Sequence, residues 1–243
     1  MRRALVLIVI LLAVLVLAAC GKDAPLSDST ATTTAPVAAA TTAIQPRSAH
    51  DGCQAVAPPQ PLANPQRRRP RRKLDPHGTY IAVLRTNCGE IRILLAALRS
   101  PKTTSSFAGL VRSHFYDGLT FHRIAKPGGN DYVIQGGDPL GTGNGGPGYS
   151  VVEAPAKKTR YVSGVVAMAK TAQDAPGTSG SQFFIVTAAE APLPPDYAVL
   201  GRVVAGARVV RRIAALATDP ATEMPLDPVV MERVTIEQPG RKS

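Results

Sequence analysis

The sequence predicts a mainly β domain in which an antiparallel sheet closes into a barrel, with two helices capping its ends. Three observations lead to this prediction. Several short runs are apolar or alternate between apolar and polar residues, as strands do, and two well-separated segments have helical spacing. All eleven aromatic residues lie from Tyr80 onward, so the folded domain is expected in that part of the chain.

The expected strands are short and are separated by turn residues. The first two, 80–86 and 90–95, flank Asn87-Cys88-Gly89, which is typical of a tight hairpin. Further β-like runs follow at 132–135, 164–169, 183–187, 198–204 and 229–236.

Two helices are expected between these strands. Ser100 and Pro101 are typical of an N-cap and a first helical residue, and Phe107 and Leu110 then fall on one face. The second helix is expected over 207–217, where apolar residues recur at helical spacing. Many strands with two separate helices suit a barrel with helices at its ends.

The first twenty residues are typical of an export signal. Arg2 and Arg3 precede an unbroken apolar run over 4–19, and Cys20 follows at once. The run is short for a membrane span, which needs ~20 apolar residues. Its end, Leu-Ala-Ala-Cys, resembles the bacterial lipobox. This resemblance implies that residues 1–19 are a lipoprotein signal peptide, that Cys20 is lipidated, and that the protein is extracytoplasmic and anchored to the bacterial cell membrane. A plain signal peptide or an uncleaved anchor is the alternative.

Composition divides the rest of the chain into a tether and a domain. The tether segment is rich in Ala, Thr and Pro and has no aromatic side chain, so burial cannot offset the entropy lost on ordering it. We therefore expect a disordered or extended tether over 20–77, one domain over 78–238, and a short tail over 239–243.

Much of the positive charge lies in one run of the tether. Removing Arg2 and Arg3 with the signal leaves 26 basic and 17 acidic residues. The run either contacts an anionic membrane or cell-wall surface, at ~1 kcal/mol per cation near a charged membrane, or is a solvated, self-repelling spacer. A surface adhesin would use the same run. Because no aromatic residue is interleaved, nucleic acid is not an expected partner. The six basic residues are Arg67, Arg68, Arg69, Arg71, Arg72 and Lys73.

Three cysteines are present. If Cys20 is lipidated, Cys53 and Cys88 remain as an even pair in an oxidising compartment, which favours a disulfide; two separate thiols are the alternative. The sequence has no CxxC or HExxH spacing, so no metal and no cofactor are expected.

Two stretches of the domain resemble a known family. They are FHRIAKPGGNDYVIQGGD over 121–138 and GTSGSQFFIVT over 177–187, in that order. Together they are similar to the peptide-binding groove of the cyclophilins, the barrel-shaped peptidyl-prolyl cis-trans isomerases. The resemblance covers roughly residues 78–238 and implies a closed eight-stranded antiparallel barrel capped by two helices.

The resemblance also implies site residues. Arg123 would be the catalytic hydrogen-bond donor and Gln135 would steady it. The other groove residues would bind the peptide through side chains or backbone groups; they are Tyr132, Val133, Ala169, Lys170, Gln182, Phe184, Leu193 and Tyr197.

The sequence departs from the family at the groove rim. The chain has no Trp and reaches Pro192 where human-type cyclophilins have a rim tryptophan, so binding of cyclosporin is not implied. Tyr197 stands at the position of the family's groove histidine, where a phenol can still donate a hydrogen bond.

These features predict an enzyme that accelerates prolyl isomerisation while exported proteins fold. Its partners would be proline-containing segments, and the protein is expected to be a monomer. The alternative is a non-catalytic module or holdase that retains proline segments at the cell surface. Retention of Arg123 favours the enzyme, whereas the altered groove rim over 191–197 leaves the non-catalytic binding module as an alternative.

Overall fold

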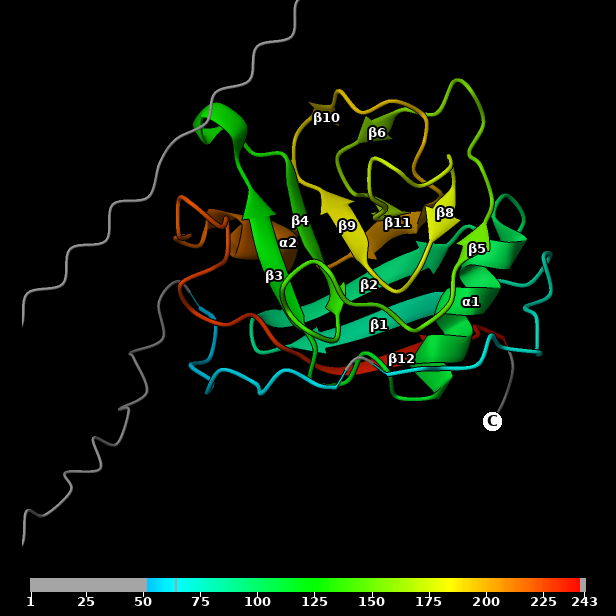
Figure 1. Cartoon of the computed structure of the whole chain (residues 1–243), viewed down its shortest axis with the longest axis horizontal. Helices are drawn as coiled ribbons and strands as arrows, with labels where there is room; N and C mark the ends of the chain where they lie inside the picture. Colours follow the sequence, from blue (N-terminus) through cyan, green and yellow to red (C-terminus); the bar gives the residue numbers. More distant parts are fainter. Residues whose placement is uncertain (1–51, 64, 241–243) are drawn as a thin grey trace, which may run out of the picture. The chain divides into compact units, whose positions relative to one another are not determined.

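The computed structural model describes residues 52–63 and 65–240 (Figure 1). The predicted signal peptide, Cys20, the tether up to residue 51 and the last three residues of the tail lie outside the described residues. No helix within the described ranges has the length and apolarity needed to cross a membrane.

Eight antiparallel strands form the main sheet, as Figure 1 shows. Their order across the sheet is β12-β1-β2-β11-β7-β9-β4-β3. Their bounds are β1 Ile81–Thr86, β2 Gly89–Leu95, β3 Thr120–Ala125, β4 Val133–Asp138, β7 Val165–Met168, β9 Phe183–Val186, β11 Val199–Ala205 and β12 Met231–Glu237. Two pairs of two-residue strands are added: β5 Val151–Val152 with β8 Thr178–Ser179, and β6 Tyr161–Val162 with β10 Glu190–Ala191.

The prediction of a closed barrel is wrong, because the sheet is open between its edge strands β3 and β12. In the described residues no ladder pairs β3 with β12: Thr120 and Val230, the residue before β12, form an isolated bridge, with backbone bonds beside it such as that from Phe121 N to Val229 O at 2.9 Å. Farther along β3, the N–H of Ile124 donates to the carbonyl of Glu223 at 2.8 Å. Residues of the loop that precedes β12 therefore occupy the position beside β3 that a closing strand would need.

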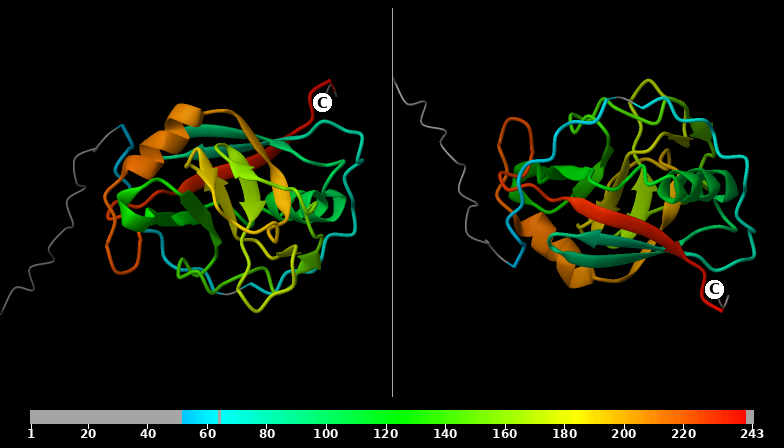
Figure 2. Two further views of the ribbon diagram at one scale, coloured as in Figure 1. Left: turned by 90° about the horizontal axis from the view of Figure 1, so that it is seen from above. Right: turned by 90° about the horizontal axis from the view of Figure 1, so that it is seen from below.

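The two helices lie at opposite ends of the sheet (Figures 1 and 2), and a short 3-10 turn, η1 Pro127–Gly129, follows β3. Helix α1, Pro101–Arg112, begins where the sequence predicts, but the side chain of Ser100 makes no capping bond. Glu153 accepts hydrogen bonds from the N–H groups of Lys102 and Thr103 instead, at 3.1 and 2.8 Å. Helix α2, Ala207–Ala215, ends two residues before the predicted end.

Strand β3 was not predicted as a strand, because a bulge interrupts its alternation. Phe121 pairs with Gly136 of β4, whereas Arg123 pairs with the next β4 residue, Gln135, so His122 is the extra residue. Phe121 belongs to the main core, where its ring meets Phe183 edge-on at 5.8 Å. The bulge allows Arg123, two positions later, to reach the opposite face.

The structure places part of the predicted tether against the domain. We call residues 52–63 and 65–77 the arm; these residues contain no helix or strand and run as extended chain along the domain (Figures 1 and 2). Cys53 and Cys88 form a disulfide that joins the start of the arm to the β1–β2 turn. Five N–H groups of the described arm donate to the domain. The bonds are Gln54 N to Asn87 O at 2.8 Å, Leu62 N to Pro139 O at 3.0 Å, Arg67 N to Pro147 O at 2.7 Å, Leu74 N to Ser105 Oγ at 2.9 Å and Asp75 N to the Tyr80 hydroxyl at 3.1 Å.

We predict that the Cys53→Ser/Cys88→Ser double variant is less stable by about 3 kcal/mol, since the disulfide closes a loop with a sequence separation of 35. Urea denaturation of the variant and of the oxidised protein measures this difference. Equal unfolding midpoints and slopes for the two proteins would show that the link does not stabilise the fold.

Candidate functional site

A second, smaller apolar cluster lies on the other face of the sheet from the main core. In β4 the side chains alternate, so Ile134 enters the main core while Val133 belongs to the smaller cluster. In β9 Phe183 and Phe184 divide in the same way. This face therefore has an apolar floor that is not covered by a helix.

Arg123 is held beside this floor by two side chains. Its Nε donates to Glu223 Oε2 at 2.6 Å, and its Nη1 donates to Gln135 Oε1 at 3.3 Å. The Arg123 and Glu223 side chains are 39% and 35% exposed, so the ion pair is partly shielded from water. The guanidinium is thus fixed at two of its three nitrogens.

The hydrogen bonds continue from Gln135 into a glycine-rich loop, residues 139–150, which we call the glycine loop. Gln135 Nε2 donates to Gln182 Oε1 at 2.9 Å. Gln182 Nε2 in turn donates to the carbonyls of Gly143 and Gly145 at 2.8 and 2.9 Å. Asp138 holds this loop by accepting from its N–H groups, among them that of Thr142 at 2.9 Å. Buried Gln182 therefore connects Arg123, through Gln135, to the glycine loop.

Nine of the ten predicted site residues line one cavity of about 130 Å³. The tenth, Gln182, does not line this cavity but accepts a hydrogen bond from Gln135, which does. The nine residues are Arg123, Tyr132, Val133, Gln135, Ala169, Lys170, Phe184, Leu193 and Tyr197.

Aromatic rings form one wall of this cavity. Phe184 and Tyr197 meet edge-on at 5.4 Å, and Lys170 Nζ lies 5.5 Å from the centre of the Tyr197 ring. Lys170 Nζ also donates to the carbonyls of Thr171 and Asp174 at 3.1 and 3.2 Å, so its charge is already partly satisfied. The wall is consequently apolar toward the floor and cationic at the rim.

Tyr161 holds the backbone of Tyr197, a residue of this wall, and was not identified from the sequence. Its hydroxyl donates to Tyr197 O at 2.7 Å and accepts from Tyr197 N at 2.9 Å. The side chain is fully buried, and this burial raises the pKa of Tyr161 to about 12. The sequence gives no signal here, because Tyr161 follows a basic and polar stretch, 157–160, and its contact joins residues 36 positions apart.

A second cavity of about 370 Å³ adjoins the first. Both are lined by Gln135, Ala169 and Lys170, and the glycine loop forms the far wall of the second. The two cavities therefore form one groove along β4 and the end of β7. An apolar pocket beside a fixed cation, within a groove of this length, is suited to an extended peptide.

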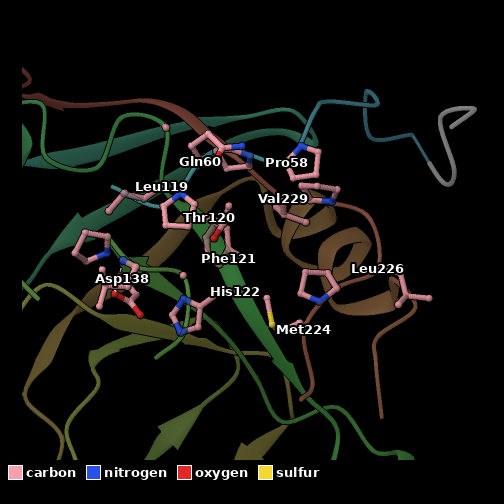
Figure 3. A pocket seen from close by; sticks show the side chains of 18 residues that line it. Pro58, Gln60, Leu119, Thr120, Phe121, His122, Asp138, Met224, Leu226 and Val229 are labelled. Carbon is pink, nitrogen blue, oxygen red and sulfur yellow. Dashed lines mark hydrogen bonds between the residues drawn. The ribbon is translucent and has the colours of Figure 1, made fainter. Parts of the chain in front are cut away.

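Figure 3 shows a third cavity, of about 280 Å³, which lies between the arm and the start of β3. Pro58 and Gln60 of the arm face Leu119, Thr120 and the Met224–Val229 segment across it. His122 also lines this cavity; it is buried, and burial lowers the pKa of its imidazole. The third cavity shares no lining residue with the groove.

Glu223, the ion-pair partner of Arg123, is the second residue at the site that sequence reasoning missed. It lies 100 positions after Arg123, in a loop that has no recognisable motif. Only the folded chain shows that the two side chains meet.

Comparison with known proteins agrees with this geometry. A family model described as cyclophilin type peptidyl-prolyl cis-trans isomerase/CLD matches residues 81–236. Peptidyl-prolyl cis-trans isomerase A of Mycobacterium tuberculosis is 37% identical over 179 residues, which are 66% of this chain and 94% of the relative. Peptidyl-prolyl cis-trans isomerase B of Streptomyces anulatus is 37% identical over 174 residues, 64% of this chain and 95% of the relative.

A solved structure has the same fold. A cyclophilin type isomerase of Cryptosporidium parvum, crystallised in the presence of the dipeptide Ala-Pro, aligns with a TM-score of 0.59 and 28% identity. The alignment covers 65% of this chain and 99% of that structure. The chain therefore belongs to the cyclophilin-type peptidyl-prolyl cis-trans isomerases, and it is an enzyme of that class.

We predict that Tyr161→Phe destabilises the protein by about 1–3 kcal/mol at pH 8, because both backbone groups of Tyr197 lose their partner. The phenol of Tyr161 must stay neutral in the folded state, so its contribution is complete below the unfolded pKa of about 10 and is lost as the pH rises toward 12. The stability gap between the two proteins should therefore narrow above pH 10. Urea denaturation at several pH values measures it, and a gap that stays constant to pH 11.5 would contradict this role for Tyr161.

Proposed function

We propose that Arg123 accelerates isomerisation by donating a hydrogen bond to the prolyl nitrogen of a peptide bound in the groove. The observation that supports this most directly is the fixed guanidinium at the edge of an apolar pocket. Nη2 has no hydrogen-bond partner among the described residues, so it is the nitrogen left to meet a ligand.

The chemistry needs a donor and a pocket, but no nucleophile. Rotation about an X-Pro bond loses amide resonance, against a barrier of ~18–20 kcal/mol, and no covalent bond is made or broken. When the amide twists, the lone pair localises on the prolyl nitrogen, which then becomes a better acceptor. A donor aimed at that nitrogen stabilises the twisted state more than either planar state, and that difference is what lowers the barrier.

The remaining groove residues would hold the peptide while one side of the bond turns. Phe184, Val133 and Leu193 offer an apolar pocket for the proline ring. Gln135 is bonded to both Arg123 and Gln182, so it can steady the arginine. The N–H of Ala169 already donates to Gln182 O at 2.9 Å, so strand addition by the peptide would have to use other backbone groups there.

Arg123→Ala should lower kcat/KM for a proline peptide by roughly 100-fold or more, the usual effect of removing a transition-state donor. Arg123→Lys should restore little, because an ammonium lacks the planar fork that Glu223 and Gln135 hold. Exchange NMR without a coupled protease gives the rate. Arg160→Ala, which breaks the ion pair with Glu190 at the surface, is the matched control and should leave the rate unchanged. Wild-type activity in Arg123→Ala would overturn the mechanism, and slow exchange in the wild type with the peptide bound would instead indicate a holdase.

We further propose that the protein works outside the cytoplasm on proline segments of exported proteins, held at the bacterial membrane by lipidated Cys20. The support is the signal sequence, which lies outside the described residues. The even cysteine pair is consistent with an oxidising compartment, since Cys53 and Cys88 form a disulfide.

The basic run of the arm is proposed as a second, weaker attachment to an anionic surface. Its six basic side chains, from Arg67 to Lys73, are exposed, and none of them has an ion-pair partner among the described residues. The run is also ordered, because Leu74 is buried and Pro70 packs against Gly109 of α1. Burial and the nearby Arg72 lower the pKa of Arg112, so cations are crowded on this side of α1.

Fractionation of a bacterial host that makes the protein tests both attachments. Cys20→Ser should move most of the protein from the membrane fraction to the soluble fraction. Replacement of Arg71, Arg72 and Lys73 by Gln in the Cys20→Ser protein should weaken the remaining binding to vesicles with anionic lipid, by ~1 kcal/mol per cation lost. The same three changes with Cys20 intact should leave the protein in the membrane fraction. Unchanged fractionation of Cys20→Ser would exclude the lipid anchor, and unchanged vesicle binding would exclude the role of the basic run.

A further inference from the structure

The loop between α2 and β12 contains a short segment, Thr218–Pro225, whose shape is strongly fixed. We call it the Glu223 loop. Its two ends form an isolated bridge, and Asp219 Oδ1 accepts from the N–H groups of Ala221 and Thr222 at 2.8 and 2.9 Å. Asp219 N also donates to Met224 O, and Glu223 N to Asp219 O, both at 2.8 Å. Glu223 is therefore presented from a closed turn.

Glu223 has a backbone conformation that is unusual for its residue type. Its φ is 58°, in the left-handed region that favours glycine. His114 is the other residue besides glycine with positive φ in the described ranges. A glutamate at such a position is strained, and backbone strain of this kind clusters at functional sites.

The backbone and the side chain of Glu223 accept hydrogen bonds from two consecutive residues of β3. Its carbonyl accepts from Ile124 N at 2.8 Å, and its carboxylate accepts from Arg123 Nε at 2.6 Å. The first bond fixes the loop to the strand and the second fixes the direction of the guanidinium. The bond to Glu223 joins opposite charges over 2.6 Å, whereas the bond from Nη1 reaches the neutral amide of Gln135 over 3.3 Å, so the bond to Glu223 is the stronger of the two.

We propose that Glu223 is a positioning residue for isomerisation, which aims Nη2 of Arg123 into the groove. This inference rests on the proposed role of Arg123. The carboxylate on Nε and the amide oxygen on Nη1 together fix the plane of the guanidinium, so rotation about the last side-chain bond is blocked.

The Glu223 carboxylate also has an electrostatic effect that would lower activity, so the direction of the change on removing it distinguishes the two effects. A negative charge 2.6 Å from Nε reduces the positive potential that Arg123 presents to a substrate. If potential alone mattered, removal of Glu223 would raise activity. A free arginine side chain loses entropy when it is oriented for reaction. If the orientation of the guanidinium matters more than its potential, removal of Glu223 therefore lowers activity.

The experiment compares Glu223→Gly, Glu223→Gln, Arg123→Ala and the double variant Arg123→Ala/Glu223→Gly in the purified protein. Glu223→Gly removes the carboxylate and is compatible with the left-handed backbone at this position, so it should lower kcat about tenfold. The dissociation constant of a proline peptide should change less than about twofold, because the apolar pocket stays intact. Glu223→Gln should be intermediate, since an amide oxygen still accepts from Nε. Glu90→Gln, which breaks a surface ion pair with Arg92, is the control.

Two further readouts separate a positioning role from a structural one. The Nε–H resonance of Arg123 should move upfield and exchange faster with water in Glu223→Gly, because its hydrogen bond is lost. In the Arg123→Ala background, Glu223→Gly should cause no further loss of kcat.

Unchanged or raised kcat in Glu223→Gly, while Arg123→Ala is inactive, would overturn the inference and leave the Arg123 mechanism standing. A further loss in the double variant would also overturn it, because Glu223 would then act by another route. Full activity of Arg123→Ala would instead remove the mechanism on which the inference rests.

Discussion

The placement of one permanently charged group beside apolar surface is the constraint on which the site depends. A guanidinium next to Phe184 and Val133 loses part of its water, and it must be hydrogen-bonded to remain there. Glu223 and Gln135 supply those bonds directly. Gln182 and the glycine-loop carbonyls orient Gln135 in turn. The bulge at His122 is what brings Arg123 to this face, since strict alternation would have sent it toward the core with Phe121.

Alternation and short motifs were enough to predict most of the sheet and most of the groove. Seven of the eight main strands were expected within a few residues, because runs such as 80–86 and 183–187 are apolar and are bounded by turn residues. The groove residues were found because the cyclophilin motifs hold Arg123, Gln135 and Gln182 at fixed positions. Their roles in binding and catalysis remain predictions.

The sequence could not show contacts between distant segments that have no recognisable sequence pattern. The position of Glu223 depends on a loop that closes on itself before it meets β3. The barrel would close if β12 lay beside Ile124, but the Glu223 loop lies there instead. The hydrophobic pattern of the sequence does not distinguish these two arrangements. The tether was expected to be disordered or extended as far as residue 77, because it has no large side chain to anchor a core, and the cysteine pair already favoured a disulfide to the domain. Its described part, the arm, is held by backbone bonds that any residue except proline could make, and by Cys53 and Leu74.

The open seam between β3 and β12 has a consequence for how this enzyme can vary. In a closed barrel, a change in the length of one connection alters the register of its neighbours, since every strand is paired on both sides. Here the 218–225 segment lies in the seam but belongs to none of the eight strands, so a change in this segment leaves their pairing intact. The ion-pair partner of the groove arginine is thus carried by a closed turn that stands outside the sheet.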